Sequence, residues 1–182
     1  MATIVSGSMT DPPDCLVARQ ENAAILRADF SALFQRYAPD VFRFALYLSG
    51  NHSEAEDITS ETFVRAWTAP GPIEATTVKA YLFTIARNLF LHESRKQGRN
   101  TGLNDELRDP QPGPLVLAEQ KAELQVVLAK LQKLPETDRT ALLMRALENI
   151  PYEEIARVLK ISVTAAKVKV HRARRVLSNL YK

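Results

Sequence analysis

The sequence predicts an all-α protein of two small helical domains joined by a flexible linker. Apolar residues recur at spacings of three and four along most of the chain, which is the period of an amphipathic helix. Prolines, glycines and acidic residues interrupt this pattern over residues 100–114 and indicate a linker. We therefore expect a disordered leader over residues 1–15, a first domain over 16–99 and a second domain over 115–182.

Composition narrows the class of protein further. With 182 residues, of which 46% are hydrophobic, the chain can hold one or two small cores, and its formal net charge is +3. Cys15 is the single cysteine, which excludes an internal disulfide and fits a reducing cytosol. No apolar run is long enough to span a bilayer. We expect a cytoplasmic protein that holds no metal or cofactor and does not insert into a membrane.

The first domain is predicted to begin with helical segments between Leu16 and Gly50. Apolar and aromatic side chains from Ile25 to Leu48 keep a helical stripe, which indicates the core of a helix bundle. Pro39 lies inside this stretch and predicts a kink or a restart of the helix.

A second helix is predicted from Ser53 to Trp67. Ser53 is the expected N-cap and would form a capping box with Glu56. Ile58, Thr62 and Trp67 are expected to pack inward. The opposite, exposed side is expected to carry Glu54, Asp57, Glu61 and Arg65. Because a row of acidic side chains repels DNA, this side is either a solvated face or a docking surface for a basic protein element.

The next segment, from residue 68 to 77, is predicted to be a loop because two prolines forbid a regular helix. A third helix then runs from Thr77 to Gln97. Phe83 and Phe90 are expected beside its polar side, where rings and cations together would suit single-stranded nucleic acid, although these rings also fit a core. The buried stripe is expected to be Val78, Leu82, Ile85 and Leu89. The polar side is expected to carry Thr84, Arg87, Asn88, His92 and Arg95.

The second domain is predicted to begin with a helix over residues 115–134. Pro135 or Glu136 then opens another helix, which ends at Leu147, because proline is well tolerated in a first helical turn. A pair of shorter elements follows this helix and closes the chain.

The last part of the chain, Tyr152 to Leu177, has the pattern of a helix-turn-helix. A short helix ends at Leu159, and Ser162 is the expected N-cap of a longer one. Lys160 lies where such turns usually carry glycine, so a left-handed conformation there would cost about 1 kcal/mol. The longer helix is expected to bury Val163, Ala166, Val170, Ala173 and Leu177. Its opposite face is expected to carry Thr164, Lys167, Val168, His171, Arg172 and Arg175, flanked by Lys169 and Arg174.

This cationic face predicts binding to duplex DNA. No acidic residue follows Glu154, whereas eight lysines and arginines do. A basic amphipathic helix is often only a solvated surface, but here the turn and the small residues Ala156 and Ala166 coincide with the lack of acids. A recognition helix in the major groove is the favoured interpretation.

Three stretches together resemble the sigma factors of bacterial RNA polymerase. Residues 55–67, AEDITSETFVRAW, resemble the helix that docks on core polymerase, and residues 80–88, AYLFTIARN, resemble the helix that contacts the −10 element. Leu134-Pro135, with YEEIA at 152–156 and HRAR at 171–174, resembles region 4. The small size and the direct linker match the extracytoplasmic-function (ECF, group 4) subfamily.

The resemblance implies a promoter-specificity subunit that is not an enzyme. It would bind core RNA polymerase through the β′ coiled coil and the β flap, read duplex DNA at −35, and hold single-stranded DNA at −10. An anti-sigma factor is a further expected partner. The residues implied for core polymerase binding are Glu54, Asp57, Ser60, Glu61 and Val64. Those implied for −10 DNA are Arg65, Ile73, Thr76, Thr77, Thr84, Arg87, Asn88, Lys96 and Arg99. Those implied for −35 DNA are Arg145, Thr164, Lys167, Val168, His171, Arg172 and Arg175.

The sequence departs from the family pattern at the groove face. Residues 164–169, TAAKVK, stand where the family usually has Gly-Thr-Val-Lys-Ser-Arg, so Val168 would pack on a thymine methyl group instead of donating a hydrogen bond. Ser60 replaces a common glutamine, and Ile73 stands where many members carry an aromatic residue.

Two alternatives to a sigma factor stay open on the sequence. One is a helix-turn-helix regulator that binds operators without core polymerase, and the other is a helical protein-interaction module with a basic tail. Binding to core polymerase would separate them from a sigma factor.

Overall fold

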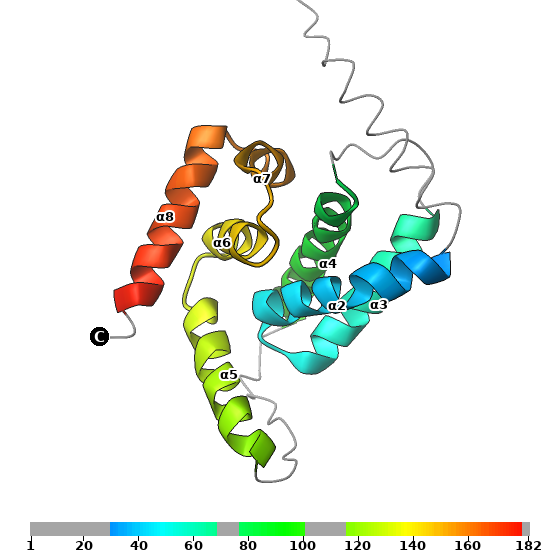
Figure 1. Ribbon diagram of the computed structural model, residues 1–182, viewed down its shortest axis with the longest axis horizontal. Helices are drawn as coiled ribbons and strands as arrows, with labels where there is room; N and C mark the ends of the chain where they lie inside the picture. Colours follow the sequence, from blue (N-terminus) through cyan, green and yellow to red (C-terminus); the bar gives the residue numbers. More distant parts are fainter. Residues whose placement is uncertain (1–29, 69–76, 101–115, 180–182) are drawn as a thin grey trace, which may run out of the picture.

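The computed structural model describes residues 30–68, 77–100 and 116–179, and these residues form seven helices (Figure 1). The N-terminal bundle consists of α2 (Phe30–Ser49), α3 (His52–Thr68) and α4 (Val78–Asn100). The C-terminal half consists of α5 (Val116–Gln132), α6 (Glu136–Glu148), α7 (Tyr152–Leu159) and α8 (Val163–Asn179). The predicted all-α fold is confirmed.

Aromatic side chains form the centre of the N-terminal bundle. Phe44 of α2 and Phe83 of α4 are fully buried and stack with their ring centroids 4.4 Å apart. Phe63 of α3 is also buried, and its ring centroid lies 4.9 Å from that of Phe34. The sequence left Phe83 and Phe90 open between the margin of the polar side of α4 and the core, and the structure places both in the core. α2 packs against one side of α4, and α6 and α7 of the C-terminal half pack against another. The solvent-exposed polar face of α4 is therefore narrower than the sequence pattern of this helix predicts.

The start and end of α3 also differ from the prediction. Asn51 caps the helix, because its side-chain oxygen accepts a hydrogen bond of 3.0 Å from the backbone N–H of Glu54. The predicted cap, Ser53, lies within the first turn. Trp67 was expected to pack inward but is 46% exposed, with its ring edge against Phe30. In the preceding helix, α2 continues through Pro39 without a restart.

The core of the C-terminal half follows the predicted stripe of α8. Ala166, Val170 and Ala173 are buried, and they pack with Met144 of α6 and Ile155 of α7. Small residues on α8 allow the close approach of crossing helices that a helix-turn-helix requires. The helix-turn-helix predicted from Tyr152 to Leu177 is observed as α7 and α8, and α8 continues two residues further, to Asn179.

Helix α6 lies between the two parts of the molecule (Figure 1). It packs against α7 and α8 on one side and against α2 and α4 of the N-terminal bundle on the other. Residues near its start and end therefore determine which surfaces of the bundle stay exposed.

Candidate nucleic-acid interface

The face of α8 that the sequence predicts to bind DNA is open to solvent. Val168, at its centre, is 50% exposed, and the helix is anchored by buried Ala166 and Val170 on the opposite side. The exposed side chains are Thr164, Lys167, Val168, His171, Arg172 and Arg175. The structure therefore brings the predicted −35 residues of this helix together on one surface.

The turn before α8 has the conformation that the sequence predicts. Lys160 is left-handed, with φ 55° and ψ 47°, which costs a non-glycine residue about 1 kcal/mol. The backbone N–H of Ile161 donates to the carbonyl of Ala156 at 2.9 Å and closes the end of α7. Ser162 accepts a hydrogen bond of 3.1 Å from the N–H of Ala165, so its predicted capping role is confirmed. These bonds set the angle at which α8 is presented.

A buried carboxylate on α6 holds α8 in place. Asp138 of α6 is 1% exposed, and its Oδ1 accepts a hydrogen bond of 3.0 Å from Nζ of Lys169. A nitrogen of Arg172 lies 3.6 Å from its Oδ2, and Lys169 also donates to Thr137. Lys169 was predicted to flank the exposed face, but it points toward α6. Sequence reasoning missed Asp138, whose only signal is its place in the first turn of a helix.

Arg145 is already engaged within the C-terminal half. One of its terminal nitrogens donates to the carbonyls of Asn149 and Ile150 at 3.1 and 3.2 Å. Its guanidinium carbon lies 4.9 Å from the ring centroid of Tyr152, and the Lys167 ammonium lies 5.8 Å from the same ring. Arg145 thus ties α6 to α7 beside the cationic face.

The predicted −10 surface on α4 is covered at Arg87 and exposed at Asn88 and Lys96. Nε of Arg87 lies 2.6 Å from one oxygen of Glu136 and a terminal nitrogen lies 3.0 Å from the other, so the two side chains form a forked pair. The Arg87 side chain is only 12% exposed. Thr84 donates to the Ala80 carbonyl, whereas Asn88 and Lys96 remain exposed.

Further −10 residues lie near the start and the end of α4. Thr77 caps this helix, since its hydroxyl accepts a hydrogen bond of 3.2 Å from the N–H of Ala80. Ile73, Thr76 and the side chain of Arg99 lie outside the described residues.

The buried stripe of α4 matches the prediction at three positions. Val78, Leu82 and Leu89 are buried, while Ile85 is half-buried. Tyr81 is half-buried, and its burial raises the pKa of the phenol.

In the acidic row on α3, Asp57 is exposed, whereas Glu54 and Glu61 are half-buried. Asp57, Ser60 and Val64 are exposed, and Glu61 forms an ion pair of 2.7 Å with Arg65 one turn later. Glu54 is half-buried: burial raises its pKa, the negative charge of Glu93 adds to the increase, and the positive charge of Arg139 opposes it. The row is therefore available for docking mainly over its later turns.

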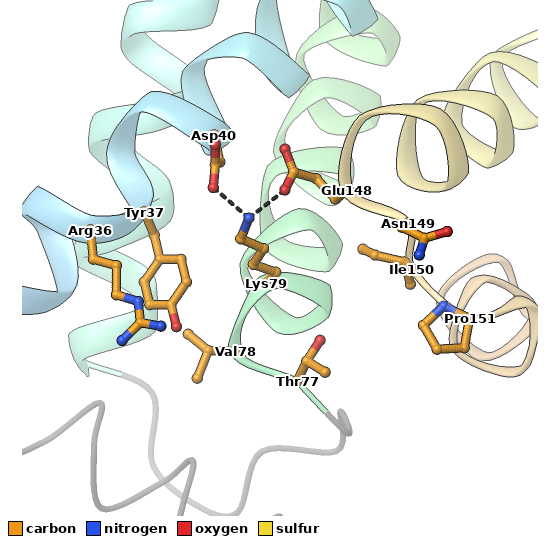
Figure 2. Close-up of a pocket in the computed structure, with 10 residues that line it drawn as sticks. All are labelled: Arg36, Tyr37, Asp40, Thr77, Val78, Lys79, Glu148, Asn149, Ile150 and Pro151. Carbon is orange, nitrogen blue, oxygen red and sulfur yellow. Dashed lines mark hydrogen bonds and ion pairs between the residues drawn. The ribbon is translucent and has the colours of Figure 1, made fainter.

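A cavity of about 500 Å³ opens where the N-terminal bundle meets the C-terminal half (Figure 2). Lys79 of α4 lines this cavity, and its Nζ lies between two carboxylates, 2.6 Å from Asp40 and in contact with Glu148. Burial alone would lower the pKa of Lys79, but hydrogen bonds to Asp40 and Glu148 and their negative charges raise it. None of these three residues was singled out from the sequence as part of a site.

Other kinds of site were sought in the same residues. Across residues 30–68, 77–100 and 116–179, histidine, cysteine and acidic side chains form no cluster that could hold a metal ion. A search for long apolar helices over this part of the chain finds none that could cross a membrane.

Both parts of the molecule match models of known protein families. Residues 33–100 match the family model Sigma-70 region 2, and residues 124–177 match Sigma-70, region 4. The chain is 32% identical over 151 residues to the ECF RNA polymerase sigma factor SigM of Bacillus subtilis, which covers 82% of this chain and 93% of that relative. It is 30% identical over 164 residues to the ECF RNA polymerase sigma factor SigL of Mycobacterium tuberculosis, covering 88% of this chain and 90% of SigL.

Solved structures show the same fold. The sigma factor RpoE from Bartonella quintana, in complex with the anti-sigma factor NepR, matches with a TM-score of 0.67 and 30% identity, over 84% of this chain and 96% of that one. CnrH in complex with the cytosolic domain of CnrY matches with a TM-score of 0.66 over 92% of this chain and 97% of that one. At 23% identity, the second match bears on the fold alone.

Proposed function

The chain belongs to the ECF sigma factors of the sigma-70 family, and from this premise we propose how its surfaces divide the work of starting transcription. As a member of this family, it directs promoter-specific initiation by RNA polymerase. A helix-turn-helix regulator that acts without core polymerase is not favoured, because residues 33–100 match sigma region 2 as well. Its relatives are specificity subunits and not enzymes.

Helix α8 reads the −35 element in the major groove. The observation that carries this proposal is its continuous exposed face, with Lys167, Val168 and His171 directed away from the buried stripe. Arg172 and Arg175 contact phosphates, which position the helix without reading sequence. Val168 packs against a thymine methyl group, as an apolar side chain in the major groove can.

Helix α4 and the loop before it hold the −10 element as a single strand. Asn88 and Lys96 are exposed on α4, and Asn88 helps to hold a flipped base. Flipping a base costs a few kcal/mol, which contacts in the pocket must offset. Loop residues Ile73 and Thr76 contribute to the same pocket, and Arg99 contacts a phosphate.

Helix α3 docks on core polymerase through its acidic row. Asp57, Ser60 and Val64 are exposed along about two turns of this helix, so they can meet a basic coiled coil of the β′ subunit. Residues 100–114 act as the linker that joins the −10 and −35 domains and reaches into the polymerase channels. An anti-sigma factor controls the protein in the cytoplasm.

A binding assay with core RNA polymerase of the source bacterium tests the docking surface. Asp57→Arg places a cation against a basic partner, and we expect it to weaken binding about tenfold or more. Glu56→Arg is the matched control, since it makes the same kind of charge change on the same helix but on another face, where Glu56 lies 3.6 Å from His52. Equal binding by Asp57→Arg and the unchanged protein would contradict the proposed surface.

Transcription in vitro tests the function as a whole. Core polymerase supplemented with the purified chain is expected to initiate at a discrete set of promoters in a library of genomic DNA. Asn88→Ala is expected to leave binding of duplex −35 DNA unchanged and to reduce melting at −10, measured by permanganate reactivity of unpaired thymines. If melting were unchanged, Asn88 would not belong to the pocket.

A further inference from the structure

A buried carboxylate of α6 faces two cations of α8, the helix proposed to read the −35 element. Asp138 is 1% exposed and belongs to the first turn of α6, where the helix dipole favours a negative charge. Lys169 and Arg172 are three residues apart on α8, so their side chains leave the same side of that helix. Asp138 therefore lies within reach of both cations.

The two oxygens of Asp138 are used differently. Oδ1 accepts a hydrogen bond of 3.0 Å from Lys169, whose ammonium also donates to Thr137 and whose side chain is only 23% exposed. Oδ2 is buried and accepts no hydrogen bond from the residues that the structure describes, and a terminal nitrogen of Arg172 lies 3.6 Å from it. A buried carboxylate oxygen without a donor is unfavourable, so Oδ2 attracts the guanidinium of Arg172.

Arg172 can face Asp138 and a partner in solvent at once, because its side chain is 60% exposed. A guanidinium holds five N–H donors in a rigid planar fork, so one edge can stay against a carboxylate while another edge binds a phosphate. A lysine ammonium is a point charge on a flexible stem and lacks this fixed direction. Asp138 is itself too buried to touch DNA and can act on DNA binding only through other residues.

Arg175, the next cation along the same face of α8, lacks such support. Its side chain is exposed about one turn beyond Arg172, and among the described residues no carboxylate lies within ion-pair distance of it. The two arginines share a helix and a face but differ in the acid behind them. Arg175 is therefore a matched comparison for Arg172.

We propose that Asp138 is a positioning residue for −35 binding, which holds Arg172 in the direction in which its guanidinium meets a DNA phosphate before DNA is bound. A side chain that is already ordered loses less conformational entropy on binding, so this support raises the affinity. The charge of Asp138 acts in the opposite sense, since an acid near a DNA-binding face repels phosphates. The gain in affinity rests on the proposed contact of α8 with −35 DNA, whereas the ordering of Arg172 in the free chain does not.

Substitution of Asp138 by asparagine separates these two effects by their sign. Asp138→Asn keeps the size of the side chain and an oxygen for Lys169 but removes the negative charge. The probe is a duplex with the −35 element of a promoter found by transcription in vitro. Loss of charge alone would tighten its binding, whereas loss of positioning should weaken it about threefold, because Arg172 must then be immobilised on binding.

Two controls accompany this measurement. Glu123→Gln makes the same change of net charge at an exposed position of α5 and should not weaken binding. In an Arg172→Ala background, Asp138→Asn should not weaken binding either, because the residue through which Asp138 acts is absent. Unchanged or tighter binding by Asp138→Asn in the otherwise unchanged chain overturns the proposal.

Replacement of Arg172 by lysine tests the proposal without any change in the core. Arg172→Lys keeps the charge but not the rigid fork, so it should lose nearly as much duplex affinity as Arg172→Ala. At Arg175, lysine should recover most of the affinity that alanine loses. Equal recovery at the two positions overturns the positioning role, and this comparison holds even if Asp138→Asn does not fold.

The order of the Arg172 side chain in the free chain gives a readout that needs no DNA. NMR relaxation of the Nε–H groups should show Arg172 more ordered than Arg175, and Asp138→Asn should remove this difference. Equal mobility of the two arginines in the unchanged chain overturns the proposal. An Arg172 that is ordered and loosens in Asp138→Asn supports it even if the purified chain failed to start transcription with core polymerase, a result that would overturn only the proposed function.

Discussion

The cationic faces of α8 and α4 differ in how much of each is available. On α8, Lys167, His171 and Arg175 are exposed, and the helix offers them at a fixed angle. On α4, Arg87 is 12% exposed and is paired with a carboxylate of the other half. The difference teaches that the local pattern of a helix identifies a polar face, but the fold determines whether that face can meet a partner.

Two acids on α6 account for much of this difference. Glu136 and Asp138 are two residues apart, so they project about 200° apart around the helix axis. Glu136 reaches the N-terminal bundle and covers Arg87, while Asp138 reaches α8 and anchors Lys169 from beneath. Helix α6 thereby covers part of the cationic face of α4 and supports the cationic face of α8.

Removal of the Asp138 carboxylate that holds Lys169 of α8 should have the largest effect of the changes considered, and the effect is on stability. Asp138→Ala leaves the ammonium of Lys169 without its buried carboxylate, and we expect the free energy of unfolding to fall by about 2–3 kcal/mol. Chemical denaturation of the full chain measures it. Asp57→Ala, which removes an exposed acid from α3, should change this free energy by less than about 0.5 kcal/mol. Equal effects of the two changes would contradict a supporting role for Asp138.

A smaller loss is expected when a single cation is removed from the open face. Arg175→Ala should weaken binding of promoter duplex about fivefold, because one phosphate contact is lost. It should also lower the slope of log affinity against log salt by about 0.9. Lys133→Ala, at an exposed position between α5 and α6, is the control and should alter neither value. A salt slope that did not change in Arg175→Ala would place this residue outside the DNA interface.

The helix-turn-helix could be predicted from sequence because its determinants are local. Lys160 is left-handed, Ser162 caps α8, and the stripe through Val170 is buried, as the spacing and the residue types indicate. Each of these features depends on residues within two turns of one another. Local physical chemistry was sufficient there.

The contacts of α6 with α4 could not be predicted in the same way. Arg87 and Glu136 are 49 residues apart, and the pairing of Glu148 with Lys79 spans 69 residues. Helical periodicity says nothing about which part of the chain faces a polar stripe. The same limit left Phe83 and Phe90 open between the core and the margin of the polar face, because the sequence does not show that α2 and α6 pack against them.

The smallest expected effect concerns an acid of α3 at the edge of the covered region. Burial raises the pKa of Glu54 above its ordinary 4.5, and Glu93 raises it further, although Arg139 opposes them. Between pH 4.5 and the raised pKa, the folded chain binds more protons than the unfolded chain, so ionisation of Glu54 reduces stability as the pH rises. Glu54→Gln should therefore reduce this loss of stability above pH 4.5.

Urea denaturation across this pH range measures the effect, and Asp57→Asn serves as the control on the same helix. The Glu54→Gln chain should be slightly more stable than the unchanged protein at neutral pH and no more stable at pH values well below 4.5. A gain of the same size at every pH would instead assign it to side-chain packing. A loss at neutral pH would mean that Arg139 attracts ionised Glu54 strongly enough to outweigh its burial.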